Sequence, residues 1–290
     1  VYDVLHQKMA TCKKPVYPIL PSVLTAREEV AEFAGKGHVF FSDEVVFGHA
    51  LSKVFHRMPP APAVPALPAV DHARIRQIIS ECEDGYIAPA AIQGLMDACG
   101  IPRAGEAVVT SSAEAVESTK NLGFRGVMKV GGPVHKSDVG GVVLNVRDEK
   151  RVVEEFERMI RIKDTTAVLI QPMLSGIELF VGAKYEPKFG HLVLCGMGGI
   201  FIEVLKDVNA GLAPLGHEEA LYMIRSLKSY KIIKGVRGQA GVDEERFAEI
   251  ITRLSALLAH APEIVELDFN PLLGTPEKVV AVDARIRISR

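Results

Sequence analysis

One stretch of the sequence concentrates the side chains and glycines that phosphate chemistry requires. It covers residues 126–145, GVMKVGGPVHKSDVGGVVLN, and contains Lys129, His135, Gly140 and Gly141. Glycine lets backbone N–H groups come close to an anion, and lysine supplies a positive point charge. Two short β-rich runs flank the loop, which is an arrangement typical of a flap over phosphates. A solvated hairpin loop is the alternative interpretation.

His135 is, among the nine histidines, the one that stands in such a loop. With an ordinary pKa of about 6.5, an imidazole can act as a base, a metal ligand or a nucleophile. A single histidine in a sequence is more often structural. Beside a phosphate site, however, an imidazole is a candidate phosphoryl acceptor.

A second group of polar residues lies near the C-terminus. In the run ELDFN, Glu266, Asp268 and Asn270 alternate with apolar residues and therefore share one face of a strand. Asp283 ends the apolar run 279–282 and can face the same group if the two runs form a hairpin. A few hard oxygen ligands suit Mg²⁺ bridging nucleotide phosphates. A polar sheet face turned to water is the alternative.

A third candidate segment is Gln171-Pro172-Met173, followed by Glu178 at the start of a strand. A strand that leaves its sheet at Pro172 would expose backbone N–H and C=O groups able to read an adenine edge. Glu178 would then accept hydrogen bonds from ribose hydroxyls. An ordinary strand end explains the pattern equally well.

The glycines in Gly196-Met197-Gly198-Gly199 do not form a dinucleotide-binding fingerprint. The third glycine of G-x-G-x-x-G is missing, and a β-rich run follows where a helix should start. We therefore exclude a Rossmann fold. The segment is either a loop beside phosphates or a tight bend in a strand.

The elements that would position these residues divide at a proline-rich stretch, residues 58–70, which contains five prolines. Such density predicts a semi-rigid linker. Residues 1–57 are expected to form a β–α–β–α piece, with strands at 15–20 and 38–41. Residues 71–290 have an α+β pattern. The strands predicted there lie at 107–109, around Lys129, and at 142–144, 168–171, 178–184, 191–195, 265–270 and 279–283; the helices lie at 71–82, 89–98, 113–121, 151–162, 218–226 and 243–260.

Composition limits the partners. With 290 residues, 48% of them hydrophobic, the chain can bury a sizeable core in one or two domains. A net charge of −2 provides no basic field for nucleic acid or anionic lipid. The four dispersed cysteines and the lack of a long apolar run indicate a cytoplasmic protein without membrane contact. A first residue other than Met suggests a fragment or a processed product.

The chain from about Arg74 to Arg290 resembles the ATP-grasp domain of the NDP-forming acyl-CoA synthetases, and most of all that of ADP-forming acetyl-CoA synthetase. The succinyl-CoA synthetase β subunit is a related member. The motifs that carry the resemblance are Cys99–Pro102, Met128–Val130, His135–Gly141, Gln171–Met173 with Gly176 and Glu178, Phe189-Gly190, Gly196–Val204, Lys228–Tyr230, Gly235–Gly238, Glu266–Pro271 and Val282–Arg285.

The resemblance implies an ATP-grasp fold, in which two α+β subdomains clasp a nucleotide. It also implies that residues 1–57 are the C-terminal remnant of a flavodoxin-like CoA-ligase domain. The reaction would be the reversible conversion of a carboxylic acid, CoA and ATP into acyl-CoA, ADP and phosphate. It would proceed through acyl phosphate and phosphohistidine.

The family's roles carry over to matching positions of this sequence. His135 would relay the phosphoryl group, and Asp268 would orient the phosphohistidine. Mg²⁺ would be bound by Asn270 and Asp283. The nucleotide would be held by Lys129 at the phosphates, Gly140 and Gly141 in the covering loop, Gln171–Met173 at adenine, and Glu178 at ribose.

The resemblance also implies partners. CoA would be bound, and the phosphoryl group supplied, by a CoA-ligase domain or subunit that this sequence lacks, and the full enzyme would be oligomeric. The acid cannot be named, and ADP is favoured over GDP. Two alternatives remain: a non-catalytic regulatory ATP-grasp module of a fused acetyltransferase-type protein, and an ATP-grasp ligase of another acyl-phosphate type.

Overall fold

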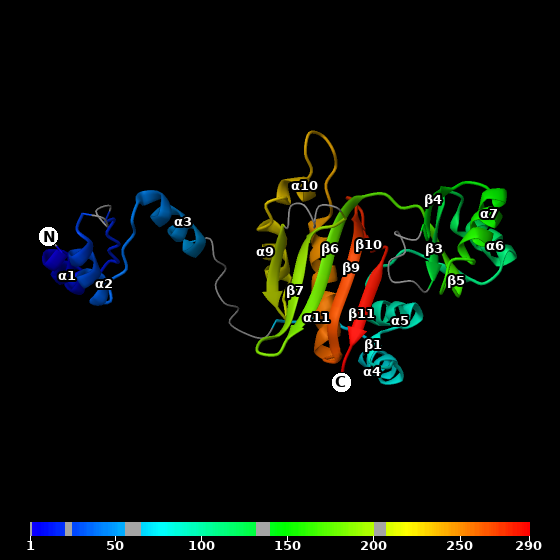
Figure 1. Ribbon diagram of the computed structural model, residues 1–290, viewed down its shortest axis with the longest axis horizontal. Coiled ribbons are helices and arrows are strands. Elements are labelled where there is room, and N and C mark those ends of the chain that lie inside the picture. The colour runs from blue at the N-terminus through cyan, green and yellow to red at the C-terminus, as the bar shows by residue number, and fades with distance from the viewer. Residues whose placement is uncertain (1, 21–24, 56–64, 132–139, 200–206) are drawn as a thin grey trace. The chain divides into compact units, whose positions relative to one another are not determined.

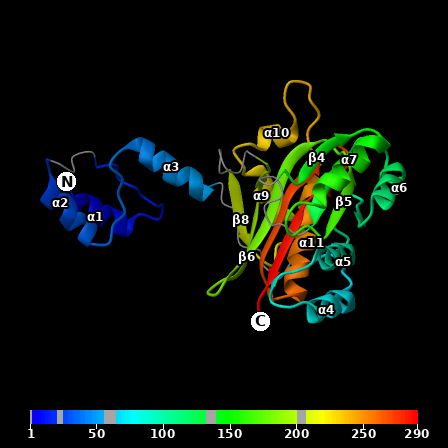
Figure 2. The ribbon, with the colours of Figure 1, turned by 45° about the vertical axis from the view of Figure 1, so that its right-hand side comes forward.

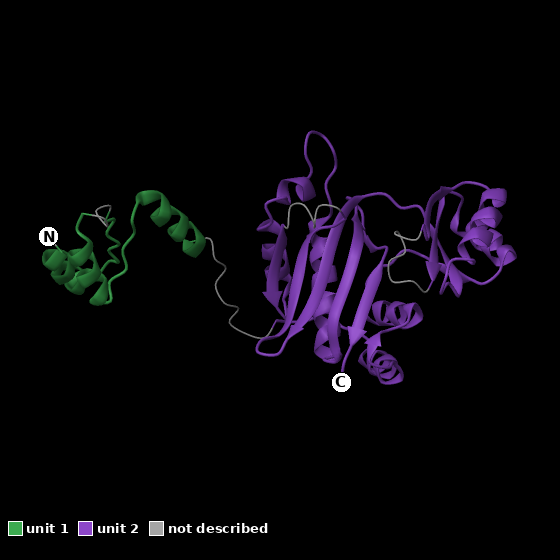
Figure 3. Ribbon diagram, viewed as in Figure 1, with its two compact units in different colours: residues 1–60 green, residues 61–290 purple. Residues whose placement is uncertain are grey.

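The computed structural model describes residues 2–20, 25–55, 65–131, 140–199 and 207–290. The chain forms two compact units, residues 1–60 and 61–290 (Figure 3). Within the described part, none of the helices combines the length and apolar character needed to cross a membrane.

The N-terminal unit contains three helices, α1 (Tyr2–Thr11), α2 (Arg27–Gly35) and α3 (Glu44–Phe55). The two strands predicted at 15–20 and 38–41 are wrong, since only one parallel bridge, between Ile19 and Phe41, forms there. Prolines at positions 15 and 18 remove backbone donors that a ladder would need. The assignment of this unit to a CoA-ligase domain stays a prediction.

The larger unit contains two antiparallel sheets, and Figure 1 shows the strands β7, β6, β9 and β11 of one of them side by side. We call the seven-stranded one the large sheet; its order is β1-β11-β9-β6-β7-β8, and β10 also pairs with β9. Its strands are β1 (Gly85–Tyr86), β6 (Ile177–Glu186), β7 (Gly190–Met197), β8 (Val208–Leu212), β9 (Ile264–Gly274), β10 (Val279–Ala281) and β11 (Ala284–Ile288).

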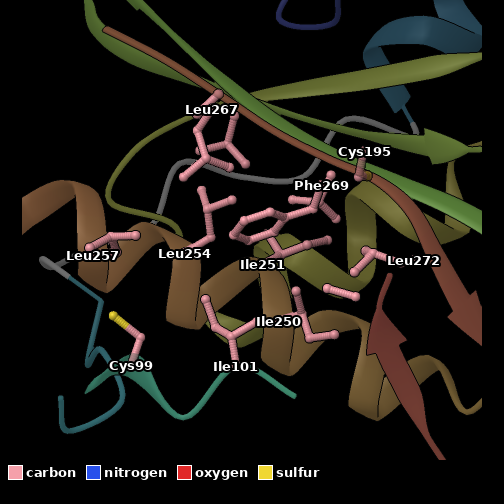
Figure 4. Packing of buried hydrophobic residues seen from close by; sticks show 14 of the residues in the cluster. Cys99, Ile101, Cys195, Ile250, Ile251, Leu254, Leu257, Leu267, Phe269 and Leu272 are labelled. Carbon is pink, nitrogen blue, oxygen red and sulfur yellow. The ribbon is translucent and has the colours of Figure 1, made fainter. Parts of the chain in front are cut away.

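Helices pack against the large sheet to make the main core. They are α4 (His72–Glu81), α5 (Pro89–Cys99), α9 (His217–Arg225), α10 (Tyr230–Lys234) and α11 (Glu244–His260). The inner face of α11 is apolar, and Ile251 and Leu254 pack there close to Phe269 of β9 (Figure 4). Burial of this continuous apolar surface fixes β9, the strand that carries the predicted acidic face.

The four-stranded small sheet has the order β2-β5-β3-β4. Its strands are β2 (Ala107–Val109), β3 (Gly126–Gly131), β4 (Val142–Val146) and β5 (Ala167–Pro172), and its helices are α6 (Ser112–Leu122) and α7 (Glu149–Met159). Both helices cover one face of the sheet (Figure 2), where Met128, Val130 and Phe156 belong to a separate core. The opposite face of the small sheet is not covered by these two helices.

Polar side chains and a glycine cap the ends of three helices. The Asp71 side chain accepts a hydrogen bond from Arg74 N at the start of α4, and Gly100 ends α5 in the left-handed region at φ +65°. At α6 the cap is Ser111, whose hydroxyl accepts from Glu114 N. These caps hold α4, α5 and α6 at the positions that the sequence predicted within a few residues.

Candidate functional site

Lys129 lies on the open face of the small sheet. Its neighbours Met128 and Val130 are buried in the core under α6 and α7, so the alternation of the strand turns Lys129 to the other side. Leu169, directly opposite Lys129 on β5, shares this face. The Lys129 ammonium donates to the carbonyl oxygen of Val282, which belongs to the large sheet's bend between β10 and β11, at 3.3 Å.

Gln171 lies on the same face and is only 3% exposed. Its amide nitrogen donates to Glu106 at 2.7 Å and to the Val282 carbonyl at 3.2 Å. Its amide oxygen is buried and has no hydrogen-bond partner within the described structure. Two donors, Lys129 and Gln171, therefore converge on one carbonyl next to Asp283.

Glu106 is the polar residue of this site that the sequence analysis missed. It precedes β2, and the Ala107–Ile170 register places it beside Gln171, 65 positions along the chain. Its second oxygen accepts from the Gln93 amide. The sequence offered only a weak signal for Glu106. It stands two positions before Val108 and therefore shares a face with that residue, but the strand is only three residues long.

A pocket lies where these groups meet. Residues from four segments line it, among them Gln93, Arg103, Glu106, Leu169, Gln171 and Asp283. Its cavity volume is about 60 Å³, whereas ligand pockets usually measure several hundred Å³. The space at this point is therefore smaller than a usual ligand pocket.

Met173 is placed differently from the expectation. Its side chain is 45% exposed, but its backbone N–H donates to the Arg125 carbonyl at 2.9 Å. β5 continues to Pro172, paired with Gly126, so the strand does not leave the sheet where the sequence suggested. The polar group left without a partner here is the Gln171 side-chain oxygen rather than this N–H group.

The acidic face of β9 forms as predicted. Asp268 and Asn270 alternate with the buried residues Leu267 and Phe269. The Asn270 N–H donates to the Asp283 carbonyl at 3.2 Å, which brings the end of β10 to this face. The backbones of Asn270 and Asp283 thus lie side by side.

Asp268 has a perturbed environment. Burial raises the pKa of its carboxyl to about 6; the charge of Arg285, paired opposite it, works against this shift, and Asp283 and Glu266 add to it. One of its oxygens is buried without a partner in the described structure. A buried carboxyl with a raised pKa beside other acids is typical of functional sites.

The donor set fits Mg²⁺. Asn270 supplies an amide oxygen, which accepts from Gly199 N at 3.3 Å, and Asp283 supplies a carboxylate, which accepts from Ala284 N at 3.0 Å. Mg²⁺ needs only one or two such protein ligands when substrate phosphates and water complete its shell. Among the described residues, no group of three or more His, Cys, Asp or Glu could hold a metal by itself.

Gly199 lies close to both Asn270 and Glu178. A Cβ added at Gly199 would lie 1.6 Å from a carboxylate oxygen of Glu178, and the Gly198 N–H donates to the Glu178 carbonyl at 2.8 Å. At Gly198 a Cβ would lie 2.5 Å from the Leu179 carbonyl oxygen. The segment is therefore a tight bend that adjoins Glu178 and Asn270, and its position beside phosphates stays a prediction.

Gly140 and Gly141 close the hairpin between β3 and β4. The Gly140 carbonyl accepts from Arg158 at 2.9 Å, and the Gly141 carbonyl accepts from Val130 N at 2.8 Å. Gly140 has φ +66°, a conformation that favours glycine. His135, the predicted phosphoryl acceptor, lies outside the described residues.

Comparison with known proteins identifies relatives of this chain. A protein-family model described as an ATP-grasp domain matches residues 77–288. The β subunit of an ADP-forming acetate–CoA ligase I from Pyrococcus furiosus is 36% identical over 226 residues, which cover 74% of this chain and 97% of that subunit.

Other relatives are longer. An ADP-forming acetate–CoA ligase II from Archaeoglobus fulgidus is 40% identical over 197 residues, which span 67% of this chain but only 29% of that protein. A solved structure of an acetyl-coenzyme A synthetase from Candidatus Korarchaeum cryptofilum is 31% identical, with a TM-score of 0.65 and coverage of 76% of this chain and 100% of that one. It is described with coenzyme A and Mg-AMPPCP, its phosphohistidine segment pointing towards the nucleotide-binding site.

Proposed function

Because this chain belongs to the ATP-grasp family, we propose that it is the nucleotide-binding part of an NDP-forming acyl-CoA synthetase. Its relatives are ADP-forming acetate–CoA ligases, so the chain is a ligase or part of one. The observation that carries the proposal is the meeting of Lys129 and Gln171 with the residue next to Asp283 across the two sheets. A nucleotide bound there contacts both sheets at once.

The nucleotide is held by groups of both sheets. Lys129 gives up its contact with the Val282 carbonyl and donates to phosphate oxygens instead. Gly140 and Gly141 cover the phosphates, Gln171 and Met173 flank the adenine, and Glu178 accepts from the ribose hydroxyls. Phosphoryl transfer depends above all on such positioning and on neutralised charge.

Asn270 and Asp283 would hold Mg²⁺ through their side-chain oxygens. A bound Mg²⁺ would supply positive charge that neutralises the transferred phosphate. The hydrogen bond from Gly199 to Asn270 fixes the amide with its oxygen towards this site.

His135 accepts the phosphoryl group. An imidazole nitrogen forms a bond to the γ-phosphorus of ATP, the bond between that phosphorus and the bridging oxygen breaks, and ADP leaves. Asp268, with its raised pKa, orients the imidazole. The reverse sequence makes ATP from ADP and the phosphohistidine.

CoA and the carboxylic acid bind elsewhere. The chain spans about a third or less of the longer relatives, which leaves room in those proteins for further domains. We propose that such a domain or subunit binds CoA and exchanges a phosphoryl group with His135. ADP is the preferred diphosphate, and the working enzyme is an oligomer.

Labelling with radioactive ATP tests the relay. The chain is incubated with γ-labelled ATP and Mg²⁺, and acid-labile, alkali-stable label is measured on the protein. We expect label on the natural chain and on His49→Ala, which changes an exposed histidine of α3, but none on His135→Ala. A folded natural chain that binds ATP without becoming labelled would overturn the relay and favour a regulatory module.

A further inference from the structure

Glu155 is a buried acidic residue of α7 and is only 5% exposed. A buried carboxylate destabilises a fold unless charged partners satisfy it. Two arginines of the same helix do so here. Arg151 contacts one carboxylate oxygen at 2.6 Å, and the Nε of Arg158 donates to the other at 2.7 Å. Glu155 therefore holds the Arg158 guanidinium in place.

Arg158 has a second contact, which lies outside the helix. Its Nη2 donates to the Gly140 carbonyl oxygen at 2.9 Å, while its Nε stays bound to Glu155. A guanidinium is a rigid planar fork, so the partner on one side fixes the direction of the donors on the other. Arg158 thus connects α7 to the hairpin between β3 and β4.

This contact fixes the peptide group between Gly140 and Gly141. The bond is trans, so its C=O and N–H groups point in opposite directions. The carbonyl points to Arg158 of α7, the helix that packs on the covered face of the small sheet. The Gly141 N–H therefore points away from α7, to the side of the sheet on which Lys129 lies.

The ladder of β3 with β4 does not use this N–H group. The Val130 N–H donates to the Gly141 carbonyl at 2.8 Å, and a regular antiparallel pair would return a bond from the Gly141 N–H to the Val130 carbonyl. The ladder instead ends at Lys129, opposite Val142. Among the backbone hydrogen bonds of the described residues, none has the Gly141 N–H as its donor.

We propose that Arg158 is a positioning residue that directs the Gly141 N–H towards a phosphate of the bound nucleotide. This inference rests on the proposed nucleotide site. Lys129 is on the same side of the small sheet, and it pairs with Val142, the residue after Gly141. The ammonium and the N–H group together offer the phosphate one charged donor and one neutral donor.

The contribution of Arg158 is to orient this donor before the ligand binds. Two successive glycines have wide conformational freedom, and ordering them on binding would cost entropy. With the Gly140 carbonyl held by Arg158, the direction of the Gly141 N–H is already set. The effect is confined to ligands that carry phosphate, because adenosine has no group for this donor.

The test compares ADP with adenosine, both with Mg²⁺ present, by titrations followed through the amide NMR spectrum of the ¹⁵N-labelled chain. We expect Arg158→Met to bind ADP about three- to tenfold more weakly and to bind adenosine with unchanged affinity. Arg151→Met is the matched control, because it removes the same charge from the same helix and the other partner of Glu155 but leaves the bond to Gly140 in place. It should bind both ligands like the natural chain.

The same spectra follow Gly141 directly. In the natural chain its amide resonance should shift when ADP binds but not when adenosine binds. A resonance that does not respond to ADP would overturn the inference, and this result decides the case even if Arg158→Met does not fold.

Three results with the variants would also overturn the inference. They are unchanged ADP affinity in Arg158→Met, equal weakening of ADP and adenosine in that variant, which indicates a purely structural role, and an equal loss of ADP affinity in Arg151→Met, which indicates a general effect of charge. Absence of ADP binding by the folded natural chain would remove the proposed nucleotide site itself, and the inference with it.

Discussion

Lys129 and Val282 connect the two sheets, with the Lys129 ammonium nitrogen 3.3 Å from the Val282 carbonyl oxygen. Lys129 comes from β3 of the small sheet, and Val282 stands between β10 and β11 of the large sheet. A cation that connects the two sheets is well placed to exchange a neutral carbonyl for a phosphate, which is the stronger partner.

Replacement of Lys129 by Met should weaken ATP and ADP binding at least tenfold. The apolar stem keeps its packing while the positive charge is lost, and a charge-assisted hydrogen bond contributes about 1.5–3 kcal/mol. Calorimetric titration measures the Kd. Lys150→Met, which alters an exposed lysine of α7, should leave the Kd unchanged; equal affinity in Lys129→Met would show that Lys129 does not contact the nucleotide.

Gly199→Ala should weaken nucleotide binding about tenfold in a chain that still folds, because the ribose loses a charged acceptor. The added Cβ would collide with the Glu178 carboxylate at 1.6 Å and push it out of the ribose position. Gly190→Ala is a matched control, because Gly190 also has a positive φ, +83° against +59°, but nothing lies within 4 Å of its added Cβ.

Both glycine variants should lose about 1 kcal/mol of folding free energy from backbone strain, and Gly199→Ala somewhat more. Thermal unfolding gives the stability, and titration with ADP gives the affinity. If both variants bind ADP like the natural chain, the contact between Gly199 and Glu178 has no part in the site.

Asp268→Asn should stabilise the chain at pH 7.5 in the presence of a chelator. Burial raises the pKa of Asp268 to about 6, above its value in the unfolded chain, so ionisation of this carboxyl costs folding free energy. The cost is absent below about pH 4 and complete above about pH 6. We expect a gain of about 1–2 kcal/mol at pH 7.5 after allowance for partial exposure.

Denaturant unfolding at a series of pH values measures that gain. It should grow as the pH rises from 4 to 6 and then stay constant, whereas the exposed change Glu83→Gln should give no such trend. A variant that is less stable than the natural chain at pH 7.5 would show that the Asp268 carboxylate is stabilised in the fold.

The sequence predicted the elements that depend on local pattern. Asp71 before an apolar-periodic run and Gly100 after another mark helix ends whose chemistry is contained in the adjacent residues. Lys129 between buried neighbours, and Asp268 between Leu267 and Phe269, follow from the two-residue period of a strand.

Contacts between residues far apart in the sequence could not be predicted from local patterns. The contact between Glu106 and Gln171 depends on the register of β2 against β5, which no local pattern fixes. Val282 acts through its backbone carbonyl, so its side-chain type carries no signal. Likewise, the strands expected at 15–20 and 38–41 have apolar composition, but prolines prevent a ladder.

Binding of ADP with and without Mg²⁺ is the most direct measurement of the central claim, that this chain holds a nucleotide between its two sheets. Calorimetric titration of the whole chain should show ADP and ATP binding that Mg²⁺ strengthens, and Asp283→Asn should lose most of the Mg²⁺ effect because an amide is a poorer ligand than a carboxylate. NAD should not bind. Binding of NAD in preference to ADP, or no nucleotide binding by a chain shown to be folded, would contradict the account.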